Sequence, residues 1–162
     1  VMELRLLDSE HIHAGWEINE QGLPGTGQIS EKEFEDLMGF SEFSLGAFDG
    51  NALLGFVVCL LPNTAYGSLN YAWFNQKYED FLYIDRIAVA QSHRNQGIGT
   101  LLYQSVFEHA QQLDCSVAAE VNLTPPNPGS ERFHQRHGFE KVGEFHHLKK
   151  SVTMLLRPKS LS

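Results

Sequence analysis

Between Phe81 and Val89 the side chains alternate between two faces, and from Ile98 onward the apolar positions recur at helical spacing. The first stretch is rich in aromatic and β-branched residues, which is typical of a strand. The second places apolar side chains on one side of a helix that ends near Leu113, with polar side chains such as Glu108 largely on the other. The pattern therefore predicts a strand, a tight loop and a helix, with the loop formed by Arg94-Asn95-Gln96-Gly97-Ile98-Gly99.

The remaining pattern predicts a mixed α/β sheet with helices on both faces. Strands are expected over residues 2–7, 43–48, 52–61, 116–123, 139–145 and 151–156. Helices are expected over residues 9–20, 31–38 and 128–137, each after a capping residue: Asp8 or Ser9, Ser30, and Asn127. The expected order is strand, two helices, three strands, helix, strand, helix and two strands.

A long connection, residues 62–80, separates two of the expected strands and carries five aromatic residues. A connection of this length in a compact domain is usually functional or disordered, and the aromatic residues argue against disorder. Two interpretations stay open. The segment forms a short helix, roughly Tyr71 to Tyr78, that packs at the edge of the sheet, or it forms one wall of a pocket for a substrate.

Composition limits the kind of protein. A chain of 162 residues is long enough for one domain with a real core. Twelve basic residues against twenty acidic ones give a net charge of −8, which argues against nucleic acid or an anionic membrane as a partner and favours an amine ligand. No apolar run approaches the roughly 20 residues of a membrane-spanning helix. With no signal sequence visible, Cys59 and Cys115 are expected to be buried thiols, which favours a cytoplasmic protein.

The loop before the long helix suits a phosphate group. Gly97 and Gly99 allow a ligand to approach the backbone, and the first N–H groups of a helix have no partner inside it. The partial positive charge of the helix end and the side chain of Arg94 add to the attraction. The alternative is that the glycines merely form a tight turn. Nucleotide motifs fit less well, because Leu102 breaks the dinucleotide pattern and the P-loop lysine is missing.

The pattern Arg-x-x-Gly-x-Gly directly after a strand resembles the pyrophosphate loop of the GNAT acyltransferase superfamily. A second stretch, from Asn127 to Phe139, resembles the late helix of that family, with Ser130 in the place of an alanine. The predicted order of elements is similar to the GNAT fold from end to end. Residues 83–86 and 122–130 look like a bacterial subgroup of acetyltransferases that are assigned from sequence and have no known substrate.

The resemblance implies a single acyltransferase domain over residues 1–162, with acetyl-CoA as the donor. The strands over residues 81–89 and 116–123 are expected to splay apart and to admit the pantetheine arm of the coenzyme. The implied contacts with the pantetheine are made by Ile87, Ala88, Val89 and Asn127. Those with the pyrophosphate are made by Arg94, Asn95, Gln96, Gly97, Ile98, Gly99 and Thr100. Those at the thioester end are made by Ser130, Phe133 and His134.

Amine acetylation also needs a proton donor for the leaving thiolate. The family usually offers a tyrosine, and the matching position here is His134, which titrates near neutrality and could serve. Tyr83 and Tyr103 are substitutes that are better explained as packing residues. The alternative for His134 and the nearby His137 is an exposed polar side of a helix.

A base must take a proton from the attacking amine, since a free alkylamine has a pKa near ~10. If Pro125-Pro126 is taken as a two-residue insertion, Glu120 matches the place where ribosomal-protein N-terminal acetyltransferases carry a proposed catalytic glutamate, and Asp85 is its rival. The alternatives are an ion pair of Asp85 with Arg86 and a solvated strand surface for Glu120. Neither carboxylate is essential if catalysis depends mainly on placing the two substrates together.

The predicted function is therefore direct transfer of an acetyl group from acetyl-CoA to a primary amine of a small molecule, a peptide or a protein N-terminus. The alternative is an acyl-CoA sensor module with weak catalysis, because His134 replaces the tyrosine. No metal is expected, since the histidine pairs at 11/13 and 146/147 lack further ligands at metal-binding spacing. The resemblance also leaves room for a homodimer, since such domains often pair.

Overall fold

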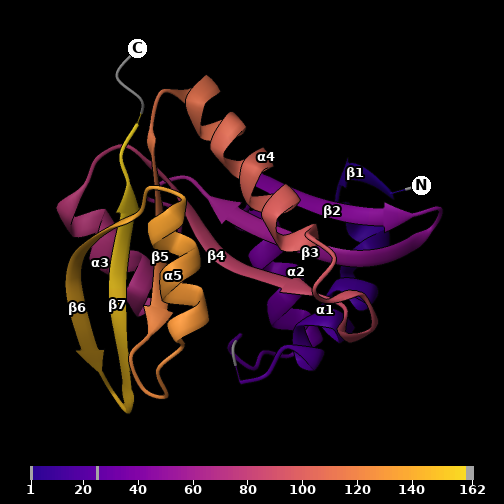
Figure 1. Cartoon of the computed structure of the whole chain (residues 1–162), viewed down its shortest axis with the longest axis horizontal. Coiled ribbons are helices and arrows are strands. Elements are labelled where there is room, and N and C mark those ends of the chain that lie inside the picture. Colours follow the sequence, from indigo (N-terminus) through magenta and orange to yellow (C-terminus); the bar gives the residue numbers. More distant parts are fainter. Residues whose placement is uncertain (1, 25, 160–162) are drawn as a thin grey trace. The chain divides into compact units, whose positions relative to one another are not determined.

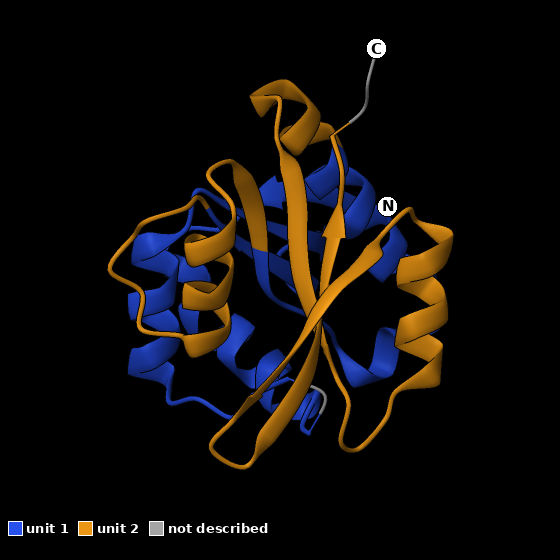
Figure 2. Cartoon of the chain, turned by 90° about the vertical axis from the view of Figure 1, so that its left-hand side faces the viewer, with its two compact units in different colours: residues 1–60, 84–107 blue, residues 61–83, 108–162 orange. Residues whose placement is uncertain are grey.

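The computed structural model describes residues 2–24 and 26–159. The chain divides into two compact units (Figure 2), residues 1–60 with 84–107, here unit 1, and residues 61–83 with 108–162, here unit 2. Strand β4 (Phe81–Val89) contributes residues to both units. The expectation of a single domain stays a prediction.

Unit 1 is built on an antiparallel group of strands (Figure 1). β1 (Met2–Leu6) pairs with β2 (Phe43–Asp49), and β2 pairs with β3 (Ala52–Leu60). Helix α1 (Ile12–Gln21) packs against α2 (Glu31–Phe40) and β3. Most of β3 is apolar and buried because both of its faces are covered, and the rings of Phe34 and Phe56 meet edge to face at 5.3 Å.

Unit 2 contains a second strand group and two complete helices. β5 (Ser116–Asn122) pairs with β7 (Lys150–Arg157), which pairs with β6 (Glu140–His147), and both pairs are antiparallel. Helices α3 (Leu69–Lys77) and α5 (Pro128–Arg136) lie on opposite sides of these strands (Figures 1 and 2). This arrangement confirms the predicted sheet with helices on both faces.

The strand order is β1-β2-β3-β4-β5-β7-β6. β4 and β5 run parallel, and their pairing covers three residue pairs, Phe81–Tyr83 with Ser116–Ala118, although the strands have nine and seven residues. β5 instead pairs along most of its length with β7. The short parallel pairing agrees with the predicted splaying, and the mixed sheet confirms the predicted fold class.

Local sequence signals determine where the helices begin. In a capping box, the Ser30 hydroxyl accepts a hydrogen bond from the Glu33 N–H, and the Ser30 N–H donates to the Glu33 carboxylate. Asn127 caps α5, with Pro128 in the first turn. Helix α4 (Ile98–Leu113) and strand β4 have the bounds that the pattern predicted. The structure also confirms a short helix in the 62–80 connection, where Ser68 caps α3.

The main differences from the predicted bounds lie at the first helix and at the last two strands. The first helix starts later than predicted, because Asp8 caps a short 3-10 turn over Ser9–His11 before α1 begins. The last two strands are longer than predicted, because His146 and His147 pair with Ser151 and Lys150. The connection between them is thus a two-residue turn rather than a five-residue loop.

Candidate active site

The loop before α4 and the start of that helix lie in unit 1, and residues 94–100 are here together called the glycine loop. Its first four residues are exposed, and Asn95 and Gly97 adopt left-handed backbone conformations with φ of 64° and 80°. The first hydrogen bond of α4 runs from the Leu101 N–H to the Gly97 carbonyl at 3.1 Å. The preceding N–H groups of the helix therefore have no partner within it.

The open space around the glycines fits an approaching ligand. A Cβ placed on Gly97 or Gly99 meets no atom of the described chain within 4 Å. Gly97 needs its left-handed conformation, but Gly99 has neither a positive φ nor a close neighbour that requires the absence of a side chain. A tight turn alone explains Gly97 and leaves Gly99 unexplained, whereas a phosphate close to the backbone explains both.

Arg94 connects the glycine loop to the end of α1. Its Nη2 donates to the Gln21 carbonyl at 2.8 Å, and its Nε donates to the Val89 carbonyl at 3.3 Å. The Gln21 side chain accepts a bond from the Gln91 N–H at 2.8 Å. Because a guanidinium has five N–H donors, these two bonds leave others for a phosphate. Binding of the coenzyme by Arg94 stays a prediction.

The end of β4, where the pantetheine is expected, lies close to β3. A Cβ on Gly55 would approach the Ala88 carbonyl to 3.0 Å, so a glycine allows the two strands to lie this close. Ile87 and Val89 are half-buried. The predicted contacts of Ile87, Ala88 and Val89 with the pantetheine remain predictions.

Glu120 lies in unit 2, on β5, at the centre of a polar group. The Tyr83 hydroxyl donates to the Glu120 carboxylate, with distances of 2.8 Å to Oε1 and 2.9 Å to Oε2, and the Asn70 Nδ2 donates to Oε1 at 3.2 Å. Glu120 is half-buried. Hydrogen bonds therefore fix the position of its carboxylate, and Glu120 is not a solvated residue on the strand surface.

Tyr83 combines packing with chemistry. Its side chain is 1% exposed, and its ring lies 5.3 Å from that of Tyr71 and 5.8 Å from that of Phe74. These buried rings fix the direction of the hydroxyl toward Glu120. The interpretation of Tyr83 as a packing residue was right for the ring and incomplete for the hydroxyl.

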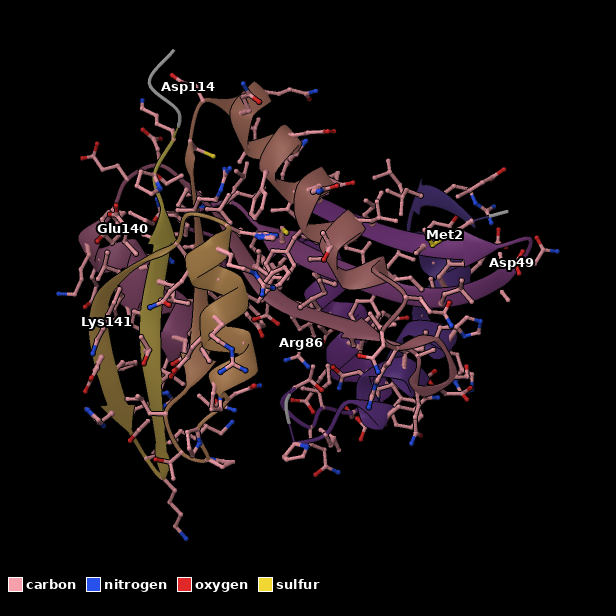
Figure 3. All side chains as sticks on the ribbon, in the orientation of Figure 1. Met2, Asp49, Arg86, Asp114, Glu140 and Lys141 are labelled. Atoms are coloured by element: carbon pink, nitrogen blue, oxygen red, sulfur yellow. The ribbon has the colours of Figure 1, made fainter. Side chains whose placement is uncertain are left out.

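Asp85, the rival base, lies in unit 1 and is already paired. Its carboxylate accepts a hydrogen bond from the Arg86 Nε at 2.8 Å. The side chain of Asp85 is only 4% exposed and that of Arg86 only 10%. Arg86, labelled on β4 in Figure 3, also donates from Nη1 to the Asn19 side chain and to the Gly27 carbonyl, both at 3.0 Å. The ion pair with Arg86 is thus present, and it links β4 to the segment after α1. A catalytic role for Asp85 stays a prediction that this geometry does not favour.

His134 is buried rather than on an exposed helix side, with 5% exposure. Its Nδ1 lies 2.7 Å from the Ser130 carbonyl and so donates to it, and its ring packs edge to face on Phe139 at 4.9 Å. Burial lowers the pKa of His134, so the neutral ring is favoured. In that state Nε2 carries no proton and can accept one. The role of His134 as the acid stays a prediction. The bond from its Nδ1 to the Ser130 carbonyl favours Nε2 as a proton acceptor.

The other residues predicted at α5 make contacts within that segment. The Asn127 side chain accepts the Ser130 N–H at 3.1 Å, which leaves its Nδ2 group for the expected pantetheine contact. Phe133 stacks on His137, with 4.3 Å between the ring centroids. Their contacts with the coenzyme stay predictions.

Two residues of the Glu120 group were not predicted. Asn70 lies half-buried in the first turn of α3, and its Oδ1 lies 2.8 Å from the His147 Nε2 on β6. From the sequence, His147 was weighed only as a metal ligand. The alternation along residues 143–147 nevertheless places it on one face of the strand with Phe145. Glu120, Tyr83, Asn70 and His147 are here called the Glu120 network. Among residues 2–24 and 26–159, no three metal-binding side chains come together.

A mixed sheet with a parallel strand pair and a glycine loop at the start of a helix is the arrangement expected for a coenzyme A-dependent acyltransferase. Residues 12–139 match the model of the acetyltransferase (GNAT) family, so the chain belongs to this family and is an acetyltransferase. This finding confirms the predicted family and enzyme class. No match was found among curated proteins.

Solved structures agree with the fold. The Escherichia coli ribosomal-protein-S18-alanine N-acetyltransferase superimposes with a TM-score of 0.76 at 14% identity, over 100% of this chain and 96% of that one. Ard1 from Thermoplasma volcanium gives 0.78 at 16% identity, over 99% of each chain. Arabidopsis thaliana NAA60 in complex with acetyl-CoA gives 0.74 at 18% identity, over 96% of this chain and 97% of that one. At these identities the likeness concerns the fold. In the described part of the chain, every helix is too short or too polar to cross a membrane.

Proposed function

We propose that this protein transfers the acetyl group of acetyl-CoA directly to a primary amine. Acetyl-CoA supplies an activated acetyl group as a thioester. The N–H groups of the glycine loop, with Arg94 beside them, bind its diphosphate, in keeping with the open space around Gly97 and Gly99. The structure of NAA60 with acetyl-CoA makes this donor the first choice.

The observation that carries the proposal is the Glu120 carboxylate held by Tyr83 and Asn70. A fixed, half-buried anion attracts an ammonium group and can take its proton. The net charge of −8 favours cationic acceptors over anionic ones. Glu120 is therefore the proposed base, ahead of Asp85, whose charge is balanced by Arg86.

The transfer balances as follows. The ammonium gives one proton to Glu120, and the free amine then attacks the thioester carbonyl. The carbon–nitrogen bond forms, the carbon–sulfur bond breaks, and the second proton lost by nitrogen ends on the departing thiolate. The sum is an N-acetylated product, free coenzyme A and one released proton.

A peptide N-terminus is the first acceptor to try, because the E. coli neighbour is named for acetylation of a protein alanine. Small-molecule amines form the second group. We place the activity in the cytoplasm, since both cysteines are unpaired and buried, as suits a reducing compartment.

The test incubates the protein with acetyl-CoA and a panel of peptides and small amines, and follows acetylation by mass spectrometry. Glu120→Gln should lower kcat by about 10²-fold or more while leaving the Kd for coenzyme A unchanged. Glu140→Gln, at the exposed start of β6 (Figure 3), is the matched control and should retain full activity. Binding of coenzyme A without acetylation of any amine would contradict the proposal.

The second candidate function is an acyl-CoA sensor. It is favoured by His134, whose lowered pKa leaves no proton on Nε2 for the leaving thiolate at neutral pH. A sensor would bind coenzyme A with unchanged affinity in Glu120→Gln and would show no turnover in either form.

A further inference from the structure

The hydrogen bonds of the Glu120 network have a fixed direction. An ionised carboxylate only accepts, so the Asn70 amide must present its Nδ2 to Glu120 at 3.2 Å. The Asn70 Oδ1 then points to the His147 Nε2 at 2.8 Å and needs a donor there. His147 must therefore carry its proton on Nε2.

The other nitrogen of His147 agrees with this assignment. Its Nδ1 is buried and has no hydrogen-bond partner among the described residues. A proton on Nδ1 would be buried without an acceptor, which is costly, whereas a bare nitrogen loses less. The ring is further held by Phe145, whose ring centroid lies 4.6 Å away. The imidazole is thus oriented and donates from Nε2 toward Asn70.

Helix α3 and strand β6, which carry Asn70 and His147, pack closely against each other. A Cβ on Gly143 of β6 would come within 2.7 Å of the Trp73 ring on α3, so glycine is needed for the helix to sit this close. Asn70 lies one helical turn before Trp73, on the same side of α3. The contact between α3 and β6 therefore places Asn70 between His147 and Glu120.

We propose that Asn70 and His147 are positioning residues for the acceptor's base: through two directed hydrogen bonds they hold Glu120 ionised and fix the orientation of its carboxylate. This inference rests on the proposed function, in which Glu120 takes the proton of the amine. The groups that face Glu120 include Tyr83 from β4, Asn70 from α3 with His147 of β6 behind it, and Met154, its uncharged partner on β7.

The first test replaces Asn70 by aspartate, which has nearly the same shape but cannot donate to Glu120. Two adjacent carboxylates disfavour double ionisation, so the rising limb of kcat/KM against pH should move up by about one pH unit or more. Asn75→Asp makes the same change on the same helix, where the side chain accepts the Asn63 N–H, and should leave the profile in place.

The second test compares two variants of His147. His147→Leu removes the donor and should lower kcat by about tenfold, the effect of one lost hydrogen bond. His147→Gln places an N–H close to the original Nε2 and should recover most of that rate. His146→Gln, at the exposed neighbour that bonds to Ser151, is the control and should match the wild type.

The Kd for coenzyme A and the far-UV circular dichroism of each variant show that it is folded. If Glu120→Gln is inactive while Asn70→Asp and His147→Leu keep the wild-type rate and pH profile, the positioning role of Asn70 and His147 is overturned and the proposed function stands. Equal losses in His147→Gln and His147→Leu overturn the directed bond from His147. Full activity of Glu120→Gln overturns the role of Glu120 as the base. The positioning role of Asn70 and His147 is then overturned as well.

Discussion

Gly97 and Gly99 both lie at the start of α4, but the backbone requires a glycine only at the first of them. The φ of 80° at Gly97 is unfavourable for any residue with a Cβ. Gly99 lies in the first turn of the helix, where alanine has the better helix propensity and would meet no described neighbour within 4 Å. A structural role and a ligand-binding role can therefore be separated between these two residues.

Gly99→Ala should leave the free energy of unfolding unchanged or slightly higher, and weaken coenzyme A binding roughly tenfold or more, because a methyl group blocks approach of the diphosphate to charge-assisted N–H donors. Gly97→Ala should instead lower the free energy of unfolding by about 1 kcal/mol. Urea unfolding and isothermal titration with coenzyme A measure the two quantities. Unchanged affinity in Gly99→Ala would mean that the loop is only a turn.

At the scale of helices and strands, the sequence predicted what depends on neighbours along the chain. Strand β4 and helix α4 have the predicted bounds, because the period of their apolar positions is visible in the sequence itself. The capping residues Ser30 and Asn127 mark helix starts for the same local reason. The fold class followed from these signals.

The Glu120 network could be predicted only in part. Asn70 lies 50 residues from Glu120 and 77 from His147, so their meeting depends on strand pairing and on where α3 packs. The ion pair of Asp85 with Arg86 joins neighbouring residues and was foreseen as an alternative. Burial of His134 was missed because α5 is strongly polar, and the side of the helix that faces the strands is set by tertiary packing.

The packing of α3 on β6 gives a prediction for the stability of the protein. Gly143→Ala puts a methyl group 2.7 Å from the Trp73 Cζ2, and such overpacking should cost about 1–3 kcal/mol of the free energy of unfolding. In Trp73→Leu the same alanine should cost less, so the two changes should couple in a double-mutant cycle. Gly39→Ala in α2, where no described neighbour lies within 4 Å, is the control and should leave the free energy of unfolding unchanged or slightly higher.

Urea unfolding of the wild type, Gly143→Ala, Trp73→Leu and the double variant measures the coupling between the two changes. Additive effects of Gly143→Ala and Trp73→Leu would show that the ring does not rest on Gly143. Because Asn70 shares a side of α3 with Trp73, Gly143→Ala should also reduce acetylation, whereas Gly39→Ala should not.

At the scale of the whole chain, each compact unit carries one part of the proposed chemistry. Unit 1 holds the glycine loop and the Arg86 ion pair, and unit 2 holds the Glu120 network and His134. β4 supplies Tyr83 to the second unit and residues 84–89 to the first. Within unit 2, neutral His134 is part of the packing, so its protonation is expected to affect stability as well as catalysis.

The dependence of stability on pH follows from the histidines. The pKa of His134 lies below its ordinary 6.5, chiefly through burial, and the pKa of His137 is lowered by burial and by Arg136 and Arg157. Between the folded value and 6.5 the unfolded chain binds more protons, so the free energy of unfolding falls as pH falls below about 6.5. The stabilisation from these neutral rings is complete above that pH. Each such group contributes a slope of at most about 1.4 kcal/mol per pH unit.

His134→Asn keeps an N–H donor near the Nδ1 position but removes the titration, so the free energy of unfolding should fall less steeply between pH 7 and pH 5 than in the wild type. His13 provides a control of opposite sign, because its pKa is raised by a hydrogen bond to Glu31 and protonation favours its folded state. His13→Asn should therefore make the fall steeper. Urea unfolding at several pH values measures both slopes, and an unchanged slope in His134→Asn would contradict a buried neutral imidazole at this position.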